Sequence, residues 1–247
     1  MDRFNTVIVN DIKYLIKNKN DLIEGSLSNG NQWNNDILLL IGYWIKKYNL
    51  KHFVNAGSHI GTIALPISKY IRKVTAIEAF PPTYKHFLEN IKLNNIKNIE
   101  TYNFALGDKS EEVYFLDNTN DRIINNTGGM HVITEDDIKN KRLSSEIHSK
   151  KIINQMIRLD DTNINGFDIL IADVEGKEYE VLSGGKEKIQ KLKPIILIEI
   201  WGNKKRRVEN MNSSSEDIVN YIINLNYKIA SRFGDNYIFV PDDLNVD

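Results

Sequence analysis

The stretch FVNAGSHIGTIA, residues 53–64, decides how the rest of the chain is interpreted. An apolar run leads into Gly57, and a second glycine, Gly61, precedes another apolar run. This pattern predicts a strand, a tight turn and a helix, an arrangement with which many α/β proteins hold a nucleotide. Glycine lets the backbone approach a ligand closely, and the start of a helix offers free amides. We therefore predict a ligand site at this turn.

The residues around the turn narrow the choice of nucleotide. No Gly-Lys-Ser/Thr sequence follows, which excludes a P-loop, and Ala56 and Ser58 flank Gly57 where a dinucleotide fingerprint needs a different spacing of glycines. Glu78 ends the next apolar run, 21 residues after Gly57. A carboxylate at that point can accept hydrogen bonds from both ribose hydroxyls. The pattern favours the adenosine of NAD or of S-adenosylmethionine.

Apolar runs that alternate with helical patterns predict the fold class. We expect an α/β fold of the Rossmann-like type, with a mostly parallel seven-stranded sheet, helices on both faces and an antiparallel C-terminal strand. No linker or repeat divides the chain, so residues 1–247 are predicted to form a single domain. Within it we expect four parts: an N-terminal helical segment (1–50), a cofactor-binding half (51–117), a loop insert over the active site (118–152) and the second half of the sheet (153–247). Single strands are predicted over 99–106 and 111–117, a helix kinked at Pro66, and one helix over 177–192.

Composition limits the classes of function. The chain has 41% hydrophobic and 26% charged residues, ordinary values for a globular protein, and no cysteine, which excludes disulfides, zinc–thiolate sites and cysteine nucleophiles. The net charge of −1 argues against a nucleic-acid partner, and the apolar run at 37–45 is too short to span a bilayer. We expect a cytoplasmic protein with no nucleic-acid or membrane partner. The sequence does not predict its oligomeric state.

Later motifs carry a family resemblance. EAFPPTYKHFLENIKLNN, FALGDKSEEVYF, RLDD, DILIADVEGKEYEVLSGGKEKI and KPIILIEI occur in this order, and the Asp-Val-Glu-Gly-x-Glu block (173–178) and the Ala-Leu-Gly-Asp block (105–108) are specific in combination. Over roughly residues 50–202, the chain resembles the FkbM family of S-adenosylmethionine-dependent methyltransferases. The resemblance implies a class I methyltransferase fold with S-adenosylmethionine as cofactor.

The resemblance also implies roles for individual residues around the cofactor. The methionine half would lie against the turn, Glu78 would hold the ribose, and Asp173 would face the methyl group and the substrate. The residues implied to bind the cofactor are Asn55, Ala56, Gly57, Ser58, His59 and Gly61 at the turn, Glu78 at the ribose, Ala79 and Phe80 beside the adenine, Asn103 and Ala105 on its other side, and Asp173.

Three residues depart from the family pattern. Asn55 stands where the family usually has Asp, His59 where it has Asn, and Ile171 where a Lys often precedes the acidic block. These departures motivate one alternative, a methyltransferase-like scaffold without activity. Glu78 and the complete Asp-Val-Glu-Gly-x-Glu block favour an enzyme.

Transfer of a methyl group to a hydroxyl requires an aligned acceptor and a base that takes its proton. His131, in the insert, is one candidate base because histidine titrates near neutral pH. Asp173, Glu175 and Glu199 are the alternative, since three carboxylates at strand ends could act as a base or hold a divalent cation. We predict no metal, and Glu178 is interpreted as a structural acid at a helix end.

The acceptor is less well defined. The family's acceptors are hydroxyls of sugars, glycans, polyketides and lipids, and the polar insert favours a sugar or a nucleotide-sugar. The run KKRR (204–207) is interpreted as a solvated turn, or alternatively as a phosphate clamp to which basic residues at 139–142 and 149–151 could contribute. A nucleic-acid methyltransferase is a weaker alternative because no Asn-Pro-Pro-Tyr motif follows the fourth strand. An oxidoreductase comes last.

Overall fold

A seven-stranded sheet forms the centre of the molecule, in the order β11-β12-β10-β9-β3-β4-β5. The computed structural model describes residues 5–116, 126–139, 151–209 and 211–244. Five neighbouring strands run parallel, whereas β12 is antiparallel to both β10 and β11. The predicted fold class is confirmed, including the antiparallel C-terminal strand. The strands are β3 (His52–Ala56), β4 (Lys73–Ile77), β5 (Ile99–Tyr102), β9 (Ile169–Ala172), β10 (Ile195–Glu199), β11 (Tyr227–Phe233) and β12 (Asn236–Pro241).

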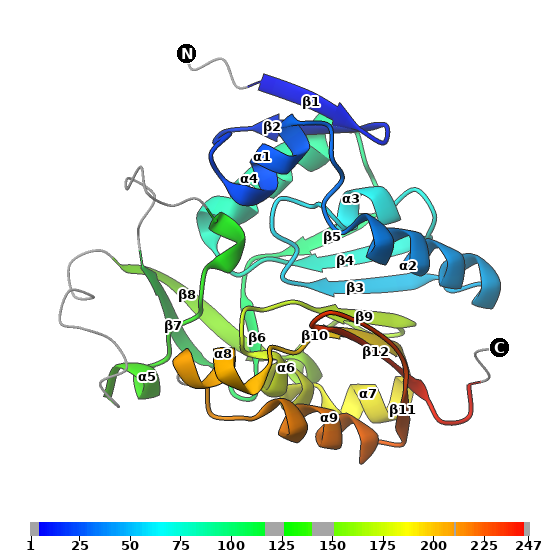
Figure 1. Ribbon diagram of the computed structural model, residues 1–247, viewed down its shortest axis with the longest axis vertical. Helices are drawn as coiled ribbons and strands as arrows, with labels where there is room; N and C mark the ends of the chain where they lie inside the picture. The colour runs from blue at the N-terminus through cyan, green and yellow to red at the C-terminus, as the bar shows by residue number, and fades with distance from the viewer. Residues whose placement is uncertain (1–4, 117–125, 140–150, 210, 245–247) are drawn as a thin grey trace.

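Helices cover both faces of this sheet (Figure 1). Neighbouring residues of β3 face opposite sides, so Phe53 packs with α2, α3 and α4 in one apolar cluster and Val54 with α6, α7 and α9 in another. A capping box begins α9, in which the side chains of Ser214 and Asp217 bond each other's backbone amides. The helices are α1 (Leu22–Ser28), α2 (Asn35–Tyr48), α3 (Ala64–Ile67), α4 (Pro81–Leu93), α5 (Glu135–Lys139), α6 (Glu178–Gly184), α7 (Lys186–Leu192), α8 (Asn203–Val208) and α9 (Ser215–Ile223).

The strand order places the candidate site. From β3 the chain proceeds through β4 to β5 on one side, and later returns to β9 on the other side of β3. In open α/β sheets, ligands bind beyond the carboxyl ends of the strands at such a reversal of strand order. Because the turn at 57–61 follows β3 directly, it lies at this point.

The N-terminal segment differs from the prediction. The sequence predicts a helical segment over 1–50, but the described part begins with a hairpin of β1 (Asn5–Val9) and β2 (Ile12–Ile16) before α1 and α2. Asn10 and Asp11 form its two-residue turn with φ of 49° and 61°, a conformation that these two residue types tolerate. Backbone groups of β2 bond the side chains of Asn90 on α4 and of Asn94, which caps the end of α4. The hairpin is therefore attached to a helix that the sequence places far away.

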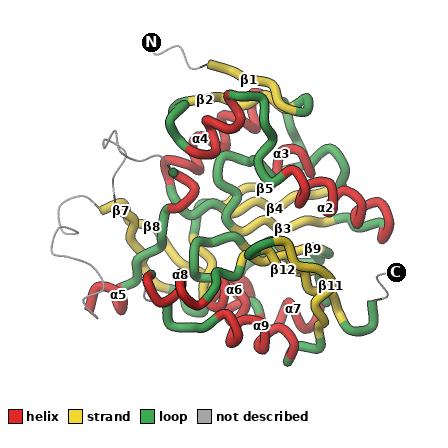
Figure 2. Tube along the Cα trace, viewed as in Figure 1, coloured by secondary structure: helices red, strands yellow, loops and turns green. Residues whose placement is uncertain are grey.

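A second, smaller sheet explains two other differences. The strand predicted over 99–106 divides at residues 103–104, and β6 (Ala105–Gly107) leaves the main sheet to pair with β8 (Lys151–Arg158). β8 also pairs antiparallel with β7 (Glu111–Leu116), so the strand predicted at 111–117 belongs to this sheet. Figure 2 shows β7 and β8 beside the main sheet.

Two predicted helices are shorter than expected. α3 is a four-residue helix that contains Pro66, and the helix predicted over 177–192 is divided at Gly185 into α6 and α7. Within the described residues, no helix has both the length and the apolar character needed to cross a membrane.

Candidate active site

A cavity of about 280 Å³ lies at the carboxyl ends of β3, β4, β9 and β10. Most of the predicted site residues line it: Asn55, Ala56, Gly57, Ser58, His59, Glu78, Ala79, Ala105, Asp173, Glu175 and Glu199. Gly61, Phe80, Asn103 and His131 do not. The cavity wall also includes residues that the sequence did not indicate, among them Leu22, Trp33, Phe115, Thr127 and Met130.

The glycine turn is fixed by close packing. Gly57 has a φ of 80°, and a Cβ atom built on it would lie 1.7 Å from the carbonyl oxygen of Asp173. Gly61 has a φ of 95°, and a Cβ atom built on it would lie 2.5 Å from the ring of Phe87. The two glycines are therefore required by the fold as much as by a ligand.

Most amides of the turn 57–61 are bonded within the protein, whereas the sequence pattern predicts free amides near this turn. Gly57 and Ser58 both donate to the carbonyl of Ile77, and Gly61 donates to the carbonyl of Ser58. The first helical residue after the turn is Ala64. The amides of Gly57, Ser58 and Gly61 are therefore not available to an anion such as pyrophosphate, which agrees with a ligand held mainly through ribose and side-chain contacts.

Glu78 is the acid best placed for a ribose. Its Oε2 accepts a hydrogen bond from the His59 amide and its Oε1 from the Phe80 amide, both at 2.8 Å. Each carboxylate oxygen retains acceptor capacity beyond these bonds. The side chain is 8% exposed, and burial raises its pKa to about 7. Asn103 lies behind it and donates to the backbone carbonyls of Glu78 and Ala79, so it orients this strand end without lining the cavity.

Asn55 forms the least satisfied part of the cavity wall. It is 1% exposed, and neither its Oδ1 nor its Nδ2 has a hydrogen-bond partner. An uncharged amide with both groups unsatisfied lies where the resemblance implies the methionine half of the cofactor. A polar group buried without hydrogen-bond partners costs free energy. A polar ligand bound here could supply the missing hydrogen bonds to Asn55.

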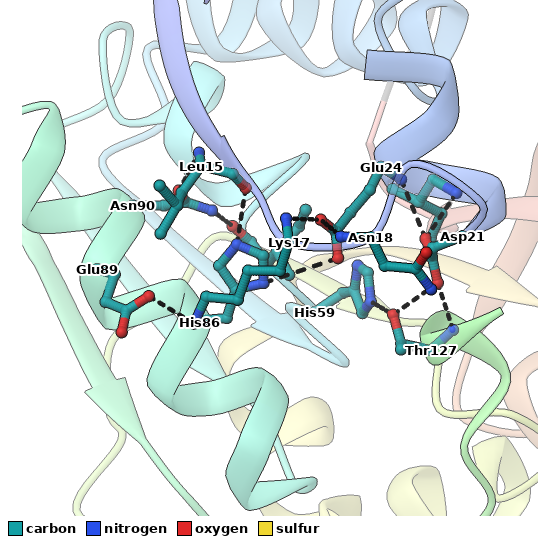
Figure 3. A network of polar contacts seen from close by, with 12 residues as sticks. Leu15, Lys17, Asn18, Asp21, Glu24, His59, His86, Glu89, Asn90 and Thr127 are labelled. Carbon is teal, nitrogen blue, oxygen red and sulfur yellow. Dashed lines mark hydrogen bonds and ion pairs between the residues drawn. The ribbon is translucent and has the colours of Figure 1, made fainter. Parts of the chain in front are cut away.

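His59 joins three segments of the chain (Figure 3). Its Nε2 lies 2.9 Å from Thr127 Oγ1, and Thr127 donates through its hydroxyl and its amide to Asp21 Oδ2 at 2.9 and 2.6 Å. Because the threonine hydroxyl gives its hydrogen to Asp21, Nε2 must carry the proton in the bond to Thr127. Burial lowers the pKa of His59 to about 4, so the ring is neutral near pH 7. The cofactor turn, the N-terminal segment and the insert therefore meet at this histidine.

The other end of the cavity is acidic. One carboxylate oxygen of each of Asp173, Glu175 and Glu199 lies within 4.8 Å of the others. Burial first, and mutual repulsion second, raise the pKa of Asp173 well above its usual range and that of Glu175 to about 7. Burial also raises the pKa of Glu199, whose Oε2 accepts a 2.6 Å hydrogen bond from Trp201 Nε1. The spacing would admit a divalent cation, but it equally suits carboxyl groups that share a proton and can accept one from a hydroxyl.

The basic run 204–207 is helical and not a turn, although Lys204, Lys205 and Arg207 are exposed as expected of a solvated segment. It lies in α8, where Lys205 lines the cavity with its Nζ 3.4 Å from the centroid of the Trp201 ring. Arg206 is turned inward and is 2% exposed, and the other two basic residues do not line the cavity. A phosphate clamp from this run would rest on Lys205 alone, beside three carboxylates. Of the other two basic stretches, 140–142 and 149–150 lie outside the described residues.

His131 lies behind the acidic group. Its Nδ1 is 3.0 Å from the carbonyl oxygen of Glu175, and its ring meets Trp201 edge-on at 5.8 Å. It lines a neighbouring cavity that shares Val132 and Lys177 with the first. From the predicted insert, the residues that line the main cavity are Asn126, Thr127, Gly128, Met130 and Val132, whereas 118–125 lies outside the described residues.

The comparisons with known proteins agree with this geometry. The family described as "Methyltransferase FkbM domain" matches residues 55–229. Among solved structures, a methyltransferase FkbM from Methylobacillus flagellatus KT superposes with a TM-score of 0.52 at 16% identity, over 78% of this chain and 44% of that chain. This chain thus spans less than half of that protein, and the likeness shows the fold. A tRNA (uracil-54, C5)-methyltransferase from Pyrococcus abyssi, in complex with S-adenosyl-L-homocysteine, has a TM-score of 0.46 at 14% identity, over 97% of this chain and 44% of that chain. No curated protein matches the sequence.

Proposed function

The chain belongs to the FkbM methyltransferase family, and from this premise we propose that it methylates a sugar hydroxyl held at the acidic end of the cavity. The observation that carries the proposal is the placement of Asp173, Glu175 and Glu199 in the same cavity as the glycine turn and Glu78. Such a cavity can hold a methyl donor at the glycine turn and offers carboxylates that can take the proton of the acceptor hydroxyl.

The residues present fit S-adenosylmethionine, which supplies a methyl group on a positively charged sulfonium. Glu78 has free acceptor capacity for the ribose hydroxyls, and Asn55 has two unsatisfied polar atoms for the amino-acid end. The cavity is bounded on the far side by carboxylates, which suit a cationic ligand. The amides of Gly57, Ser58, His59 and Gly61 are bonded within the protein, which argues against NAD.

The chain's own groups can do two things for an acceptor alcohol. The raised pKa values of the acidic group let one of its carboxyls take a proton near neutral pH, the role for which the sequence also suggests His131. Carboxylate oxygens also accept hydrogen bonds from several hydroxyls at once, which orients a polyol. His131 supports this end indirectly, through the Glu175 carbonyl.

Charge favours an uncharged sugar over a nucleotide-sugar. Three carboxylates line this end of the cavity. Among the described residues, the basic side chains that line the cavity are Lys205 and Lys177. Lys177 is paired with Asp137 at 3.2 Å. A phosphate would meet more negative than positive charge, so a neutral glycan or monosaccharide fits better.

An inactive scaffold remains the second candidate, and one observation weakens it. Asn55 and Ile171, two departures from the family pattern, are direct partners in the register of β3 and β9. Ile171 is fully buried in an apolar cluster and does not line the cavity. The family pattern has Asp and Lys at these two positions, and here both residues are uncharged. No unpaired charge is therefore left in the sheet, so the replacement at Ile171 is compatible with the one at Asn55.

A transfer assay tests the proposal. The protein would be incubated with tritiated S-adenosylmethionine and a panel of monosaccharides, oligosaccharides, nucleotide-sugars and RNA. We expect label in an uncharged sugar, and a loss of at least about 100-fold in the Asp173→Asn/Glu175→Gln variant with binding of S-adenosylhomocysteine retained. Label in RNA alone would contradict the proposed acceptor, and cofactor binding without any transfer would favour the scaffold.

A further inference from the structure

The acidic residues 173–175 lie on a turn with an unusual backbone. Glu175 has a φ of 54° and Gly176 a φ of 97°, so two successive residues occupy the left-handed region. This is rare for a residue with a side chain and requires support from its surroundings. Met211 and Trp201 lie close to this turn, because a Cβ on Gly176 would lie 2.5 Å from the Met211 methyl and 3.2 Å from the Trp201 ring.

Glu178 provides that support from inside. Its Oε1 accepts hydrogen bonds from the Gly176 amide at 2.9 Å and the Val174 amide at 3.3 Å, so one oxygen binds both sides of Glu175. The side chain is fully buried, more than a structural acid capping an exposed helix end would be. Since it does not line the cavity, it acts on the turn and not on a ligand.

Arg206 joins this turn to α8. Its Nη1 lies 3.6 Å from Glu178 Oε2, and its Nε and Nη2 donate to the carbonyl and hydroxyl of Ser213 at 2.6 and 2.7 Å. Neither Glu178 Oε2 nor Arg206 Nη1 makes a hydrogen bond. Buried ion pairs with imperfect geometry give little net stability, so stability alone does not explain this one. The neighbouring residue on α8 is Lys205, which lines the cavity.

We propose that Glu178 and Arg206 are positioning residues, which hold the turn 173–176 against α8 so that the carboxylates of Asp173 and Glu175 face the sulfonium end of the cofactor. This inference rests on the proposed function, since it assumes that S-adenosylmethionine occupies the cavity. The pair does not line the cavity itself. Its effect is to fix where the negative charge of its neighbours lies.

A ratio of two affinities reports that position. S-adenosylmethionine carries a positive sulfonium, and S-adenosylhomocysteine has a neutral sulfur in the same place. Carboxylates beside the sulfur strengthen binding of the first relative to the second, because opposite charges attract more strongly where water is excluded. A turn released from Glu178 moves its carboxylates and lowers the ratio, whereas a general loss of stability weakens both ligands alike.

The chain offers a matched control in Glu24. This glutamate is 3% exposed, and its Oε2 accepts from the amides of Lys17 and Asn18 in another turn, at 2.5 and 3.0 Å. Glu178→Leu and Glu24→Leu therefore remove the same chemistry, two backbone amides bonded to one buried carboxylate. Glu178 differs in that its turn carries the acidic group.

The experiment compares calorimetric affinities for both ligands in wild type, Glu178→Leu, Glu178→Gln and Glu24→Leu. We expect the ratio to fall about fivefold or more in Glu178→Leu, to fall less in Glu178→Gln, which keeps an acceptor oxygen, and to stay unchanged in Glu24→Leu. The double variant Glu178→Met/Arg206→Met keeps the test open if Glu178→Leu does not fold, since apolar replacement of a buried ion pair is often tolerated.

A second readout needs no ligand. The Cα and Cβ carbon-13 shifts of Glu175 report its left-handed backbone conformation, and we expect them to move toward ordinary values in Glu178→Leu but not in Glu24→Leu. An unchanged ratio together with unchanged shifts in a folded Glu178 variant would overturn the inference. If the wild-type protein bound neither ligand, the proposed function would be contradicted. The shifts alone would then show whether Glu178 holds the turn in place.

Discussion

The two ends of the cavity are built in different ways. At the cofactor end, the turn 57–61 and Glu78 come from short, adjacent strand–turn segments, and their polar groups are largely satisfied by backbone bonds between neighbours. At the acidic end, residues from β9 and β10 converge, and a buried pair between α6 and α8 holds one of the turns. The backbone of the first end is held mainly by bonds between adjacent strand ends, with His59 as its link to distant segments, and the second end depends throughout on how distant segments pack.

The strongest test of this contrast is a substitution where the two ends touch. Gly57→Ala would place a methyl group 1.7 Å from the Asp173 carbonyl oxygen, in a conformation with positive φ. We expect loss of S-adenosylhomocysteine binding by more than about 100-fold and a clear drop in thermal stability, since backbone must move on both sides.

Gly166→Ala provides the control for that substitution. Gly166 also has positive φ, 64°, but no atom lies within 4 Å of the position that an added Cβ would take, so only backbone strain of about 1 kcal/mol is expected. Equal effects of the two variants, measured by thermal unfolding and calorimetry, would show that the close contact between the two ends is unimportant.

A smaller effect is expected from the charge at the cofactor end. Burial holds the pKa of Glu78 near 7, and ribose hydroxyls donate to its ionised form, so affinity for S-adenosylhomocysteine should rise with pH up to about 7 and level off above it. Glu78→Gln should weaken binding about 10- to 100-fold at pH 8 and flatten this dependence. The check is calorimetry from pH 5.5 to 8.5. A pH dependence that survives in the variant would assign the titration to another group.

The smallest effect is expected at His131. Its Nδ1 bonds the Glu175 carbonyl from outside the main cavity. His131→Ala should change affinity for S-adenosylhomocysteine by less than about twofold, because a single neutral hydrogen bond at a remote point is lost. A large loss of affinity in calorimetry would place His131 at the cofactor and blur the distinction between the two ends.

The sequence predicted much of the cofactor end for a physical reason. The glycines at 57 and 61 and the acid at 78 mark strand ends whose positions follow from a regular alternation of strands and helices. The fold class follows from the same alternation, and it is confirmed together with the antiparallel C-terminal strand.

The remaining features depend on contacts between distant residues. Asp21 and Thr127 are 106 residues apart and share one hydrogen bond network at His59, and no local pattern indicates that pairing. The departure of β6 from the main sheet requires β8 as a partner. Arg206 belongs to a basic run that the sequence pattern assigns to the surface, although its burial is decided by Glu178 and Ser213. For the same reason His131, identified by residue type and loop position, lies behind the acidic group.

The most direct test of the central claim is calorimetric titration of the wild-type protein with S-adenosylmethionine, S-adenosylhomocysteine and NAD. The structure predicts micromolar binding of the first two, tighter for the positively charged one, and no binding of NAD. Binding of NAD, or of none of the three, would contradict the assignment of this cavity to a methyl donor.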